Sequence, residues 1–500
     1  MGDSPLILGV SGLRGIVGES LTPEVAVRYA AAFGTWLQSR GFADTAVVAR
    51  DGRAGGEVIY HAAISGLLSV GLNVRAIDTV MTPTAGVDIE PFAPGAIVVT
   101  ASHNPAEWNG LKCLVCDEEE QLGRAPTAEE ANQIISLFND GAIEYVTADE
   151  LGEVALLGSE SANKFHCDVV RSRYSALVGD TVGELAAHQM RIVLDSVNAS
   201  GSVAAESLLR SLGSNVLQLA GDRSGVFPHT PEPTKENLSG EGGLCDVVPG
   251  VKADVGFAQD PDADRLAIVD ERGEYIGEEY TLVLCAMALM EARAGDDDGE
   301  DRGKPVFVVN LSTSRMIDDV AAHYGGEVVR SAVGEANVVE IMKSLKAQGR
   351  YVVFGGEGNG GVIWPEVTYV RDSLSGMALV LSLMARTGKS VSKLVEMVNS
   401  FGPTDEVKAN GYTILKAKSD LASKADAVPV VEHLNGVYGS QDGCRVDLQD
   451  GIRIDWDERG VWAHVRASNT EPIMRVIVEA PSRAEAERVA GEIDGHILGA

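Results

Sequence analysis

The chain has 500 residues, of which 45% are hydrophobic and 23% are charged. This length exceeds what one hydrophobic core organises and predicts roughly three or four globular domains. The formal net charge of -32 excludes a general nucleic-acid-binding surface and an anionic-membrane surface, because both need positive charge. An anionic small-molecule substrate would have to be held by local basic residues.

Targeting signals and disulfides are not expected. The N-terminal segment lacks the basic and apolar regions of a signal peptide, and no apolar run approaches the roughly 18 residues that span a bilayer. We therefore expect a cytoplasmic protein with no membrane partner. Six cysteines in so long a chain do not form a disulfide framework. Cys113 and Cys116 lie in a strand pattern and point to opposite faces, so we expect them to be structural.

The chain begins with a βαβ pattern. A short apolar strand at 6–8 precedes Thr22 and Pro23, which are typical of a helix N-cap and of the first helical position. Further apolar runs predict strands at 46–49 and 74–77.

Two more units repeat this α/β plan. The second has an amphipathic helix near Asp168. It continues with a strand predicted at 191–195, a helix at 203–212 and strands at 215–219 and 253–258. It ends in a predicted hairpin of two short strands at 266–270 and 274–276. The third has a helix predicted at 278–292, a strand at 305–309, a second helix, and strands at 326–332 and 351–356.

The last hundred residues have an α+β pattern. Strands are predicted on both sides of the Asp450-Gly451 turn and at 461–468 and 473–480, followed by a helix at 483–493. The predicted fold class is α/β, with three similar mixed α/β domains and a C-terminal α+β domain. The predicted domain boundaries are 1–155, 156–271, 272–400 and 401–500.

The segment TASHNP, at 100–105, directly follows an apolar strand. Loops at strand ends are where a rigid scaffold presents reactive groups. Ser102 and His103 are therefore candidate functional residues.

Asp260, Asp262 and Asp264 alternate in a loop, which places three carboxylates on one side of an extended chain. Their repulsion is costly unless a cation lies between them, and oxygen ligands favour Mg²⁺ or Ca²⁺. A calcium loop of the EF-hand type would use Glu271, but Arg265 occupies the position that should be glycine. A solvated acidic turn is the structural alternative.

The segment GEGNGG, at 356–361, has the glycine spacing of a dinucleotide-binding loop. The residues after it are β-like and contain proline where that motif requires a helix, so we do not expect a dinucleotide site. Glu357 and Asn359 on a flexible backbone suit sugar hydroxyls better. An ordinary glycine turn is the alternative.

The segment RASNTEP, at 466–472, combines a guanidinium, two hydroxyls, an amide and backbone N–H groups, and Arg475 lies just beyond it. Such a set suits phosphate, because it offers charge-assisted donors in several directions. An ordinary Asn-Thr turn is the alternative.

These loops, with SGLRG at 11–15, resemble the motifs of the α-D-phosphohexomutase superfamily, and the similarity extends over nearly the whole chain. The resemblance implies four domains around a central active-site cleft, each contributing one loop. It implies a phosphohexomutase that interconverts hexose 6-phosphate and hexose 1-phosphate through a phosphoserine enzyme. Hexose 1,6-bisphosphate is then the intermediate and activator.

The resemblance also implies roles for individual residues. Ser102 matches the phosphoserine, and its phosphate would bind Mg²⁺ together with Asp260, Asp262 and Asp264. The residues that match positions around the transferring phosphate are Arg14, His103, Lys112 and Arg265, with Lys112 as a general acid or base. Glu357 and Asn359 match the sugar-hydroxyl loop. The residues that match the distal phosphate clamp are Arg466, Ser468, Asn469, Thr470 and Arg475.

The sugar loop departs from many relatives, which carry Ser and then Gly-His in place of Asn359 and Gly360-Gly361. A histidine of those relatives is therefore absent here. The segment is more similar to archaeal-type phosphoglucosamine mutases, which implies glucosamine phosphate as substrate, with mannose and glucose phosphates as alternatives. Such preferences depend on contacts of about 1 to 3 kcal/mol each.

Two other functional classes remain open at this point. A metal-dependent sugar phosphatase with Ser102 as nucleophile would release inorganic phosphate, and a sugar-phosphate-binding regulator would bind without turnover. The predicted distal clamp favours a mutase, because a hydrolase does not need to hold a second phosphate so firmly. The expected partner is a hexose phosphate and not a nucleic acid, and the chain is expected to be a monomer or a homodimer.

Overall fold

The structure, a computed structural model, describes residues 5–41, 44–89, 93–179, 190–295, 303–468 and 472–499. The chain divides into two compact units. The larger unit consists of 1–300 and 353–392, and the smaller unit consists of 301–352 and 393–500.

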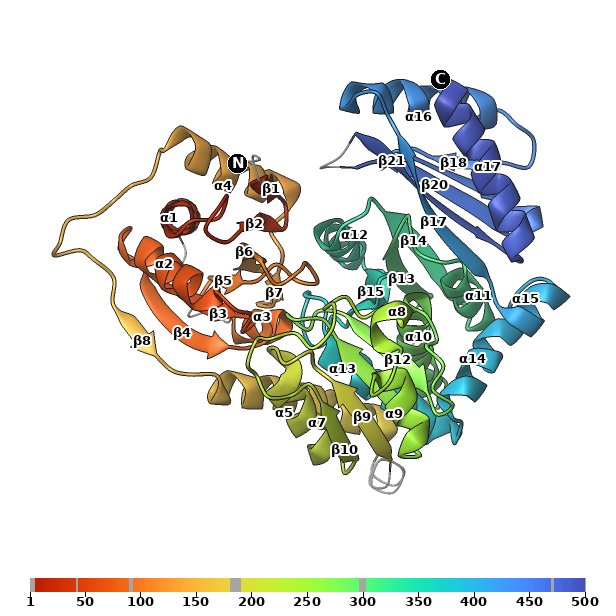
Figure 1. Ribbon diagram of the computed structural model, residues 1–500, viewed down its shortest axis with the longest axis horizontal. Helices are drawn as coiled ribbons and strands as arrows, with labels where there is room; N and C mark the ends of the chain where they lie inside the picture. Colours follow the sequence, from red (N-terminus) through yellow and green to blue (C-terminus); the bar gives the residue numbers. More distant parts are fainter. Residues whose placement is uncertain are drawn as a thin grey trace. The chain divides into compact units, whose positions relative to one another are not determined.

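The larger unit begins with an eight-stranded mixed sheet in the order β1-β2-β6-β5-β3-β4-β8, with β7 paired to β6 (Figure 1). Its strands are β1 (Ile7–Gly9), β2 (Gly12–Ile16), β3 (Thr45–Arg50), β4 (Asn73–Thr79), β5 (Gly95–Val99), β6 (Trp108–Cys116), β7 (Gly123–Arg124) and β8 (Val154–Leu156). Its helices are α1 (Pro23–Ser39), α2 (Gly56–Leu68), α3 (Thr82–Asp88) and α4 (Ala128–Asp140). β3 pairs in parallel with β4 and β5, whereas β5 and β6 are antiparallel.

Strand β3 shows why this sheet is covered on both faces. Ala46 and Val48 belong to the hydrophobic core that includes residues of α1 and α2, whereas Val47 and Ala49 belong to a second core on the other face. This alternation is the two-residue period of a strand. The predicted N-cap of α1 is confirmed, because the Thr22 hydroxyl accepts a hydrogen bond from the backbone of Val25.

A second, four-stranded sheet in the same unit has the order β10-β9-β11-β12. Its strands are β9 (Arg191–Asp195), β10 (Asn215–Leu219), β11 (Val255–Gln259) and β12 (Leu266–Asp270), and the accompanying helices are α5 (Glu160–Val178), α7 (Gly201–Ser211), α8 (Lys235–Leu238) and α9 (Leu244–Gly250). The predicted hairpin after β12 forms only in part. A single bridge joins Val269 to Tyr275, with backbone hydrogen bonds from Asp270 to Glu274 and from Ile276 to Ile268, because the chain enters the next helix at Glu278.

The remaining elements of the larger unit lie around the GEGNGG loop at 356–361. They are α10 (Glu278–Gly295), β15 (Tyr351–Glu357), β16 (Gly361–Ile363) and α13 (Ser373–Thr387). β16 pairs antiparallel with β15, so a strand and not a helix follows GEGNGG. The predicted β structure after this loop is therefore confirmed.

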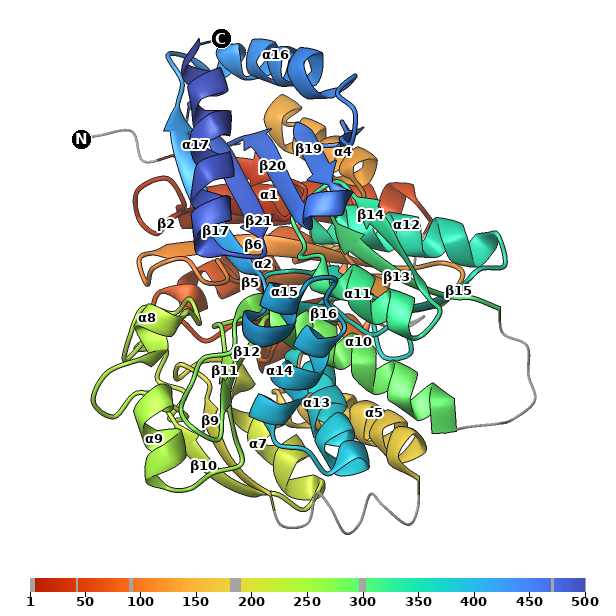
Figure 2. The ribbon, with the colours of Figure 1, turned by 90° about the vertical axis from the view of Figure 1, so that its right-hand side faces the viewer.

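The smaller unit contains a parallel strand pair, β13 (Pro305–Asn310) with β14 (Glu327–Ser331), and a five-stranded antiparallel sheet in the order β17-β21-β20-β19-β18. The strands of that sheet are β17 (Thr413–Asp420), β18 (Arg445–Asp447), β19 (Ile452–Trp456), β20 (Val461–Ala467) and β21 (Ile473–Ala480). The helices of this part of the chain are α11 (Met316–His323), α12 (Glu335–Ala347), α14 (Val391–Ser400), α15 (Asp405–Asn410), α16 (Ala427–Tyr438) and α17 (Arg483–Gly499). α17 packs along β17 and β21 (Figure 2).

The predicted fold class is confirmed, because α/β regions with mixed sheets are followed by an α+β region with an antiparallel sheet. The predicted domain boundaries and the central cleft stay predictions. All six cysteines are free thiols. In the part of the chain that the structure describes, no helix is long and apolar enough to cross a membrane.

Candidate functional site

Ser102 lies in the loop that leaves β5, in a strained conformation. Its φ of +49° is in the left-handed region, which costs energy for a residue with a Cβ. The hydroxyl of Thr100 accepts a hydrogen bond from the Ser102 amide at 2.8 Å and donates one to Asp51 at 2.7 Å. Neighbouring groups thus hold the serine in place.

A buried ion pair supports the same loop. Arg53 and Asp51 are 1% and 0% exposed, and their side chains lie 2.8 Å apart. The guanidinium of Arg53 donates to the carbonyl oxygens of Ser102 and Trp108. Because the rigid guanidinium group of Arg53 donates to several backbone carbonyls, the serine loop is preorganised before any ligand binds.

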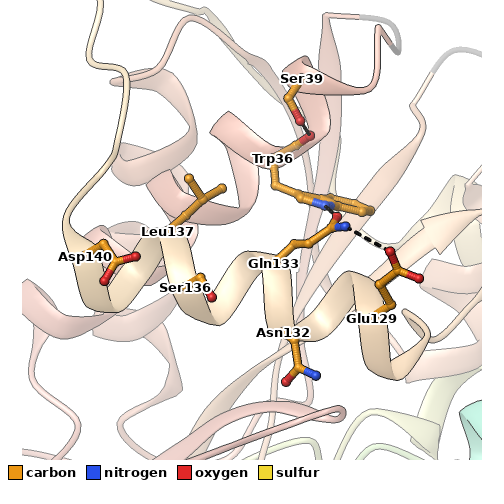
Figure 3. Close-up of a pocket in the computed structure, with 8 residues that line it drawn as sticks. All are labelled: Trp36, Ser39, Glu129, Asn132, Gln133, Ser136, Leu137 and Asp140. Atoms are coloured by element: carbon orange, nitrogen blue, oxygen red, sulfur yellow. Dashed lines mark hydrogen bonds between the residues drawn. The ribbon is translucent and has the colours of Figure 1, made fainter.

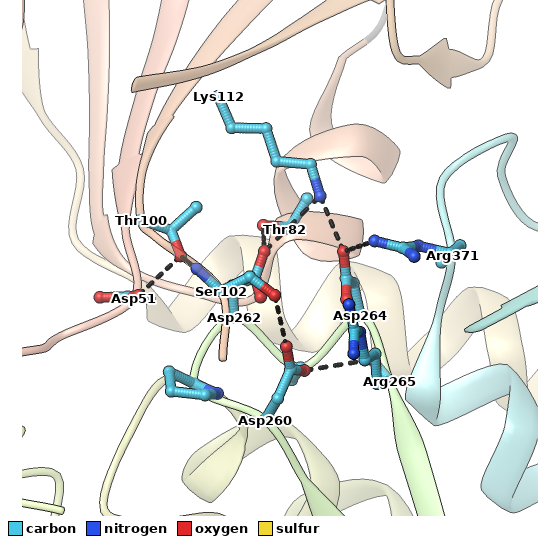
Figure 4. A network of polar contacts seen from close by, with 12 residues as sticks. Asp51, Thr82, Thr100, Ser102, Lys112, Asp260, Asp262, Asp264, Arg265 and Arg371 are labelled. Carbon is cyan, nitrogen blue, oxygen red and sulfur yellow. Dashed lines mark hydrogen bonds and ion pairs between the residues drawn. The ribbon is translucent and has the colours of Figure 1, made fainter. Parts of the chain in front are cut away.

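The three aspartates follow β11 and converge on Ser102 (Figure 4). Asp260, Asp262 and Asp264 are 0% exposed, and one carboxylate oxygen from each lies within 4.8 Å of the others. The Ser102 hydroxyl donates a hydrogen bond to Asp260 at 2.7 Å. The predicted convergence of the aspartates is therefore present, and they lie against the serine.

The carboxylate cluster fits a divalent cation. One oxygen each of Asp262 and Asp264 is buried and has no hydrogen-bond partner. Burial, followed by the charges of Asp262 and Asp264, raises the pKa of Asp260 well above its usual range. Unsatisfied buried carboxylate oxygens are costly, and hard oxygen ligands are those that Mg²⁺ prefers. Asp260, Asp262 and Asp264, with an oxygen on Ser102, are the residues that could hold the metal.

Basic groups surround the aspartates. Lys112, on β6, donates to Asp264 at 2.8 Å and lies 3.6 Å from Asp262. Burial raises the pKa of Asp264, but the charges of Arg371 and Lys112 outweigh burial and hold that pKa below its usual range. Arg14 donates to the Asn104 side chain at 3.1 Å. The site therefore combines a metal-type carboxylate cluster with cations suited to phosphate oxygens.

His103 and Arg265 lie next to the serine and the aspartates. The Nδ1 atom of His103 lies 3.3 Å from the Ser102 hydroxyl, and the backbone N–H of Arg265 donates to Asp260 at 3.1 Å. Both side chains lie 3.9 Å from the Glu232 carboxylate. Burial, followed by the charges of Arg265 and Arg14, lowers the pKa of His103 to about 2. The imidazole is therefore neutral and can donate one N–H.

The GEGNGG loop brings Glu357 to the same region. Glu357 is 4% exposed and accepts a hydrogen bond from Arg371 at 2.7 Å. Arg371 also donates to Asp264 at 2.6 Å, so it connects this loop to the aspartate cluster. The Asn359 side-chain oxygen accepts from the backbone of Gly361 at 3.1 Å and stabilises the turn.

The predicted distal clamp lies in the smaller unit. Arg466 and Arg475 are directly opposite each other on β20 and β21, and Arg466 lies 3.8 Å from Asp450. Like charges directly opposite each other destabilise a sheet, so a bound anion would relieve this pair. Ser468 is buried. Asn469 and Thr470 lie outside the described residues.

Four contributors were not identified from the sequence. Arg371 links two loops, Thr82 donates to Asp262 at 2.7 Å, and Asp51 and Arg53 support the serine loop. Only Arg371 had a nearby signal, since the next residue, Asp372, precedes an apolar helix as an N-cap would. That signal marks the helix start and gives no direction for the arginine side chain.

A separate pocket of about 720 Å³ lies between α1 and α4 (Figure 3). Its wall includes Trp36, whose indole N–H donates to Gln133 at 2.8 Å, and Glu129 beside it. None of the predicted site residues lines this pocket. It is therefore separate from the serine and aspartate cluster.

Four family models match the chain in sequence order, each described for the phosphoglucomutase/phosphomannomutase family. Domain I matches residues 5–140, domain II matches 173–273, domain III matches 278–401 and the C-terminal domain matches 417–496.

Known proteins are similar over nearly the full length. A "Phosphoglucomutase/phosphomannomutase" of Thermococcus kodakarensis is 33% identical over 96% of both chains. A "Probable phosphoglucosamine mutase" of Methanopyrus kandleri is 34% identical over 97% of this chain and 96% of its own. The crystal structure of a phosphoglucomutase/phosphomannomutase family protein from Burkholderia thailandensis has the same fold, with a TM-score of 0.76 and 23% identity over 99% of this chain and 98% of its own.

Proposed function

Because the chain belongs to the phosphoglucomutase/phosphomannomutase family and is an intramolecular phosphotransferase, we propose a specific mechanism for it. It interconverts hexose 6-phosphate and hexose 1-phosphate through a phosphoserine at Ser102 and a hexose 1,6-bisphosphate intermediate. The observation that carries the proposal is the buried Ser102 hydroxyl, 2.7 Å from Asp260 within the aspartate cluster.

The reaction consists of two phosphoryl transfers in opposite directions. In the first, the bond between Ser102 Oγ and phosphorus breaks while the free hydroxyl oxygen of the hexose monophosphate bonds to phosphorus and loses its proton. The bisphosphate then turns over, and its other phosphate returns to Ser102. The net result moves the phosphate between the two sugar positions and regenerates the phosphoserine.

The three aspartates provide the ligands for a cation at the phosphoryl group that is transferred. Asp260, Asp262 and Asp264 would hold Mg²⁺ with an oxygen of the phosphoserine, and the ion would neutralise charge on the transferring group. Thr82 orients Asp262 through its hydroxyl, and Lys112 and Arg371 both donate to one oxygen of Asp264. These contacts leave the second oxygen of Asp262 and that of Asp264 for the ion.

The basic residues transfer a proton and stabilise the negative charge of the phosphate. Lys112 is the general acid or base that takes the proton from the attacking sugar hydroxyl and returns it to the leaving oxygen. Arg14, Arg265 and the neutral His103 donate to the phosphate oxygens as charge develops.

Other residues position the sugar and its second phosphate. Glu357 and Asn359 bind sugar hydroxyls, and Glu357 is the more clearly poised because its carboxylate is buried and oriented by Arg371. Five residues form the distal phosphate clamp, namely Arg466, Ser468, Asn469, Thr470 and Arg475. The clamp holds whichever phosphate is not being transferred, so it is used twice in each cycle.

The proposed preferred substrate is glucosamine 6-phosphate, converted to glucosamine 1-phosphate. The GEGNGG loop supports this choice, and so does the name of the Methanopyrus kandleri relative. The alternative is a phosphomannomutase or phosphoglucomutase with the same mechanism, which the name of the Thermococcus kodakarensis relative favours. A cytoplasmic location and a monomeric or homodimeric state stay predictions.

The test begins with intact mass spectrometry of the purified protein. We expect a phosphate on Ser102 that exchanges with label from hexose phosphates, and Ser102→Ala should lose this phosphate and essentially all isomerisation. Full isomerisation by Ser102→Ala would refute the mechanism. Net release of inorganic phosphate would point instead to a sugar phosphatase. A panel of glucosamine, mannose and glucose 1-phosphates then ranks the substrates.

A further inference from the structure

Arg371 bridges two loops that the proposed reaction uses for different purposes. One guanidinium nitrogen donates to Asp264 at 2.6 Å, and the other terminal nitrogen donates to Glu357 at 2.7 Å (Figure 4 shows the contact to Asp264). All three side chains are at most 10% exposed. On the basis of the proposed function, we propose that Arg371 is a positioning residue that couples the sugar-binding carboxylate to the metal-binding carboxylate.

The backbone that carries Arg371 is rigid. The next residue, Asp372, is the N-cap of α13 and accepts hydrogen bonds from the amides of Leu374 and Ser375. The amide of Asp372 donates to Val362 of β16 at 2.7 Å, and its carboxylate lies 3.2 Å from the buried ring of His166. A guanidinium attached to such a rigid backbone can point in few other directions, which a residue that positions other side chains requires.

The sugar loop leaves space for the arginine side chain. A Cβ atom at position 361 would lie 2.3 Å from Cδ of Arg371, far inside van der Waals contact. The same Cβ would lie 2.9 Å from the Asn359 side-chain oxygen, so glycine at 361 is required by the paths of Arg371 and Asn359 and not by its own backbone, since Gly361 is outside the positive-φ region. The loop and the arginine form one packed unit, so a change in either should disturb both.

The geometry of the fork distinguishes positioning from simple neutralisation. Two terminal nitrogens reach two carboxylates on separate loops, and Arg371 shares one oxygen of Asp264 with Lys112. A lysine at 371 would keep the positive charge but has one nitrogen on a flexible stem, so it could not fix the separation of Asp264 and Glu357. Arg371→Lys therefore removes the coupling and keeps the charge.

Two variants test the coupling, each with a matched control. Arg371→Lys removes the pair of terminal nitrogens, and Gly361→Ala displaces Arg371, together with the Asn359 side chain, without changing any charge. The control for the first is Arg124→Lys, because Arg124 is an equally buried arginine that joins Asp117 and Glu130 in the same unit. The control for the second is Gly250→Ala, where an added Cβ would meet no atom within 4 Å. Thermal unfolding establishes that each variant is folded.

The first measurement is Mg²⁺ binding by calorimetry to the dephosphorylated protein, which requires no turnover. We expect the dissociation constant to rise about tenfold in Arg371→Lys and in Gly361→Ala, because a partner that orients a ligand typically contributes that much. The two control variants should bind Mg²⁺ as the wild type does.

The second measurement compares kcat/KM for the preferred hexose 1-phosphate with that for its 3-deoxy and 4-deoxy analogues. In the wild type, at least one missing hydroxyl should be strongly discriminated against, because Glu357 is left without its partner. In both test variants this discrimination should fall about tenfold, whereas a purely structural defect would slow all substrates equally.

The outcomes separate the coupling from the mutase reaction itself. If the wild type does not isomerise hexose phosphates, the proposed function fails. The Mg²⁺ binding measured by calorimetry still tests whether Arg371 orients Asp264. If the wild type isomerises but either measured quantity is unchanged in folded Arg371→Lys and Gly361→Ala, the coupling is wrong.

Discussion

Replacement of Asp260 by asparagine should stabilise the metal-free, dephosphorylated protein. An ionised Asp260 would be repelled by Asp262 and Asp264 across separations of at most 4.8 Å. At an effective dielectric constant of about 20, each repulsion is about 3.5 kcal/mol or more, which gives about 7 kcal/mol for the two neighbours. Protonation of a carboxyl with an ordinary pKa near 3.9 costs about 5 kcal/mol near pH 7.5. Arg265 and the Ser102 hydroxyl offset part of this repulsion, and the net effect raises the pKa of Asp260, so the native metal-free protein keeps this proton to a higher pH than the unfolded chain does.

The sign of the pH dependence follows from this proton. Burial, followed by Asp262 and Asp264, raises the pKa of Asp260 in the folded state, so the folded protein holds a proton that the unfolded chain releases above about pH 4. Stability of the wild type should therefore decline by about 1.4 kcal/mol per pH unit from this group. Asp260→Asn removes the decline, and its advantage should grow from nearly zero near pH 4 to at most about 5 kcal/mol near pH 7.5.

The assay is urea unfolding of wild type and Asp260→Asn in EDTA at several pH values, repeated with saturating Mg²⁺. In EDTA the variant should be the more stable protein, and increasingly so as pH rises. With Mg²⁺ the order should reverse, because only the wild type gains stability from the bound ion. A variant that is less stable in EDTA, or an advantage that does not change with pH, would refute the reasoning.

Three further substitutions test other parts of the structure. Thr82→Val removes the hydroxyl that donates to Asp262, so it should weaken Mg²⁺ binding about tenfold in calorimetry and lower the unfolding temperature of the metal-free protein, because a buried carboxylate loses its donor. Arg53→Lys should destabilise the protein by about 3 kcal/mol or more in chemical unfolding, because one ammonium cannot replace a buried fork on Asp51 and several carbonyls. Arg475→Gln should raise KM for the hexose phosphate at least tenfold while slightly stabilising the ligand-free protein, since Arg466 loses a like charge directly opposite it.

Several features of this protein follow from local sequence patterns. Thr22 and Pro23 mark the start of α1 because capping and φ restriction act within one turn. The alternation of Asp260, Asp262 and Asp264 predicted convergent carboxylates, and the proline-containing stretch after GEGNGG excluded a helix. The second strand of the hairpin after β12 is shorter than predicted, because the turn residues do not reveal how soon the chain enters the next helix.

The order of strands and loops along the chain was therefore readable from the sequence, since periodicity and turn chemistry involve neighbouring residues. The meeting of Ser102 with Asp260, which are 158 positions apart, depends on how two sheets pack and has no local signal. The same is true of Arg371, whose side chain is directed to Asp264 and Glu357 by the cap of α13 and by the space at Gly361. Local chemistry decided which groups are present, and tertiary packing decided which of them share one buried cluster.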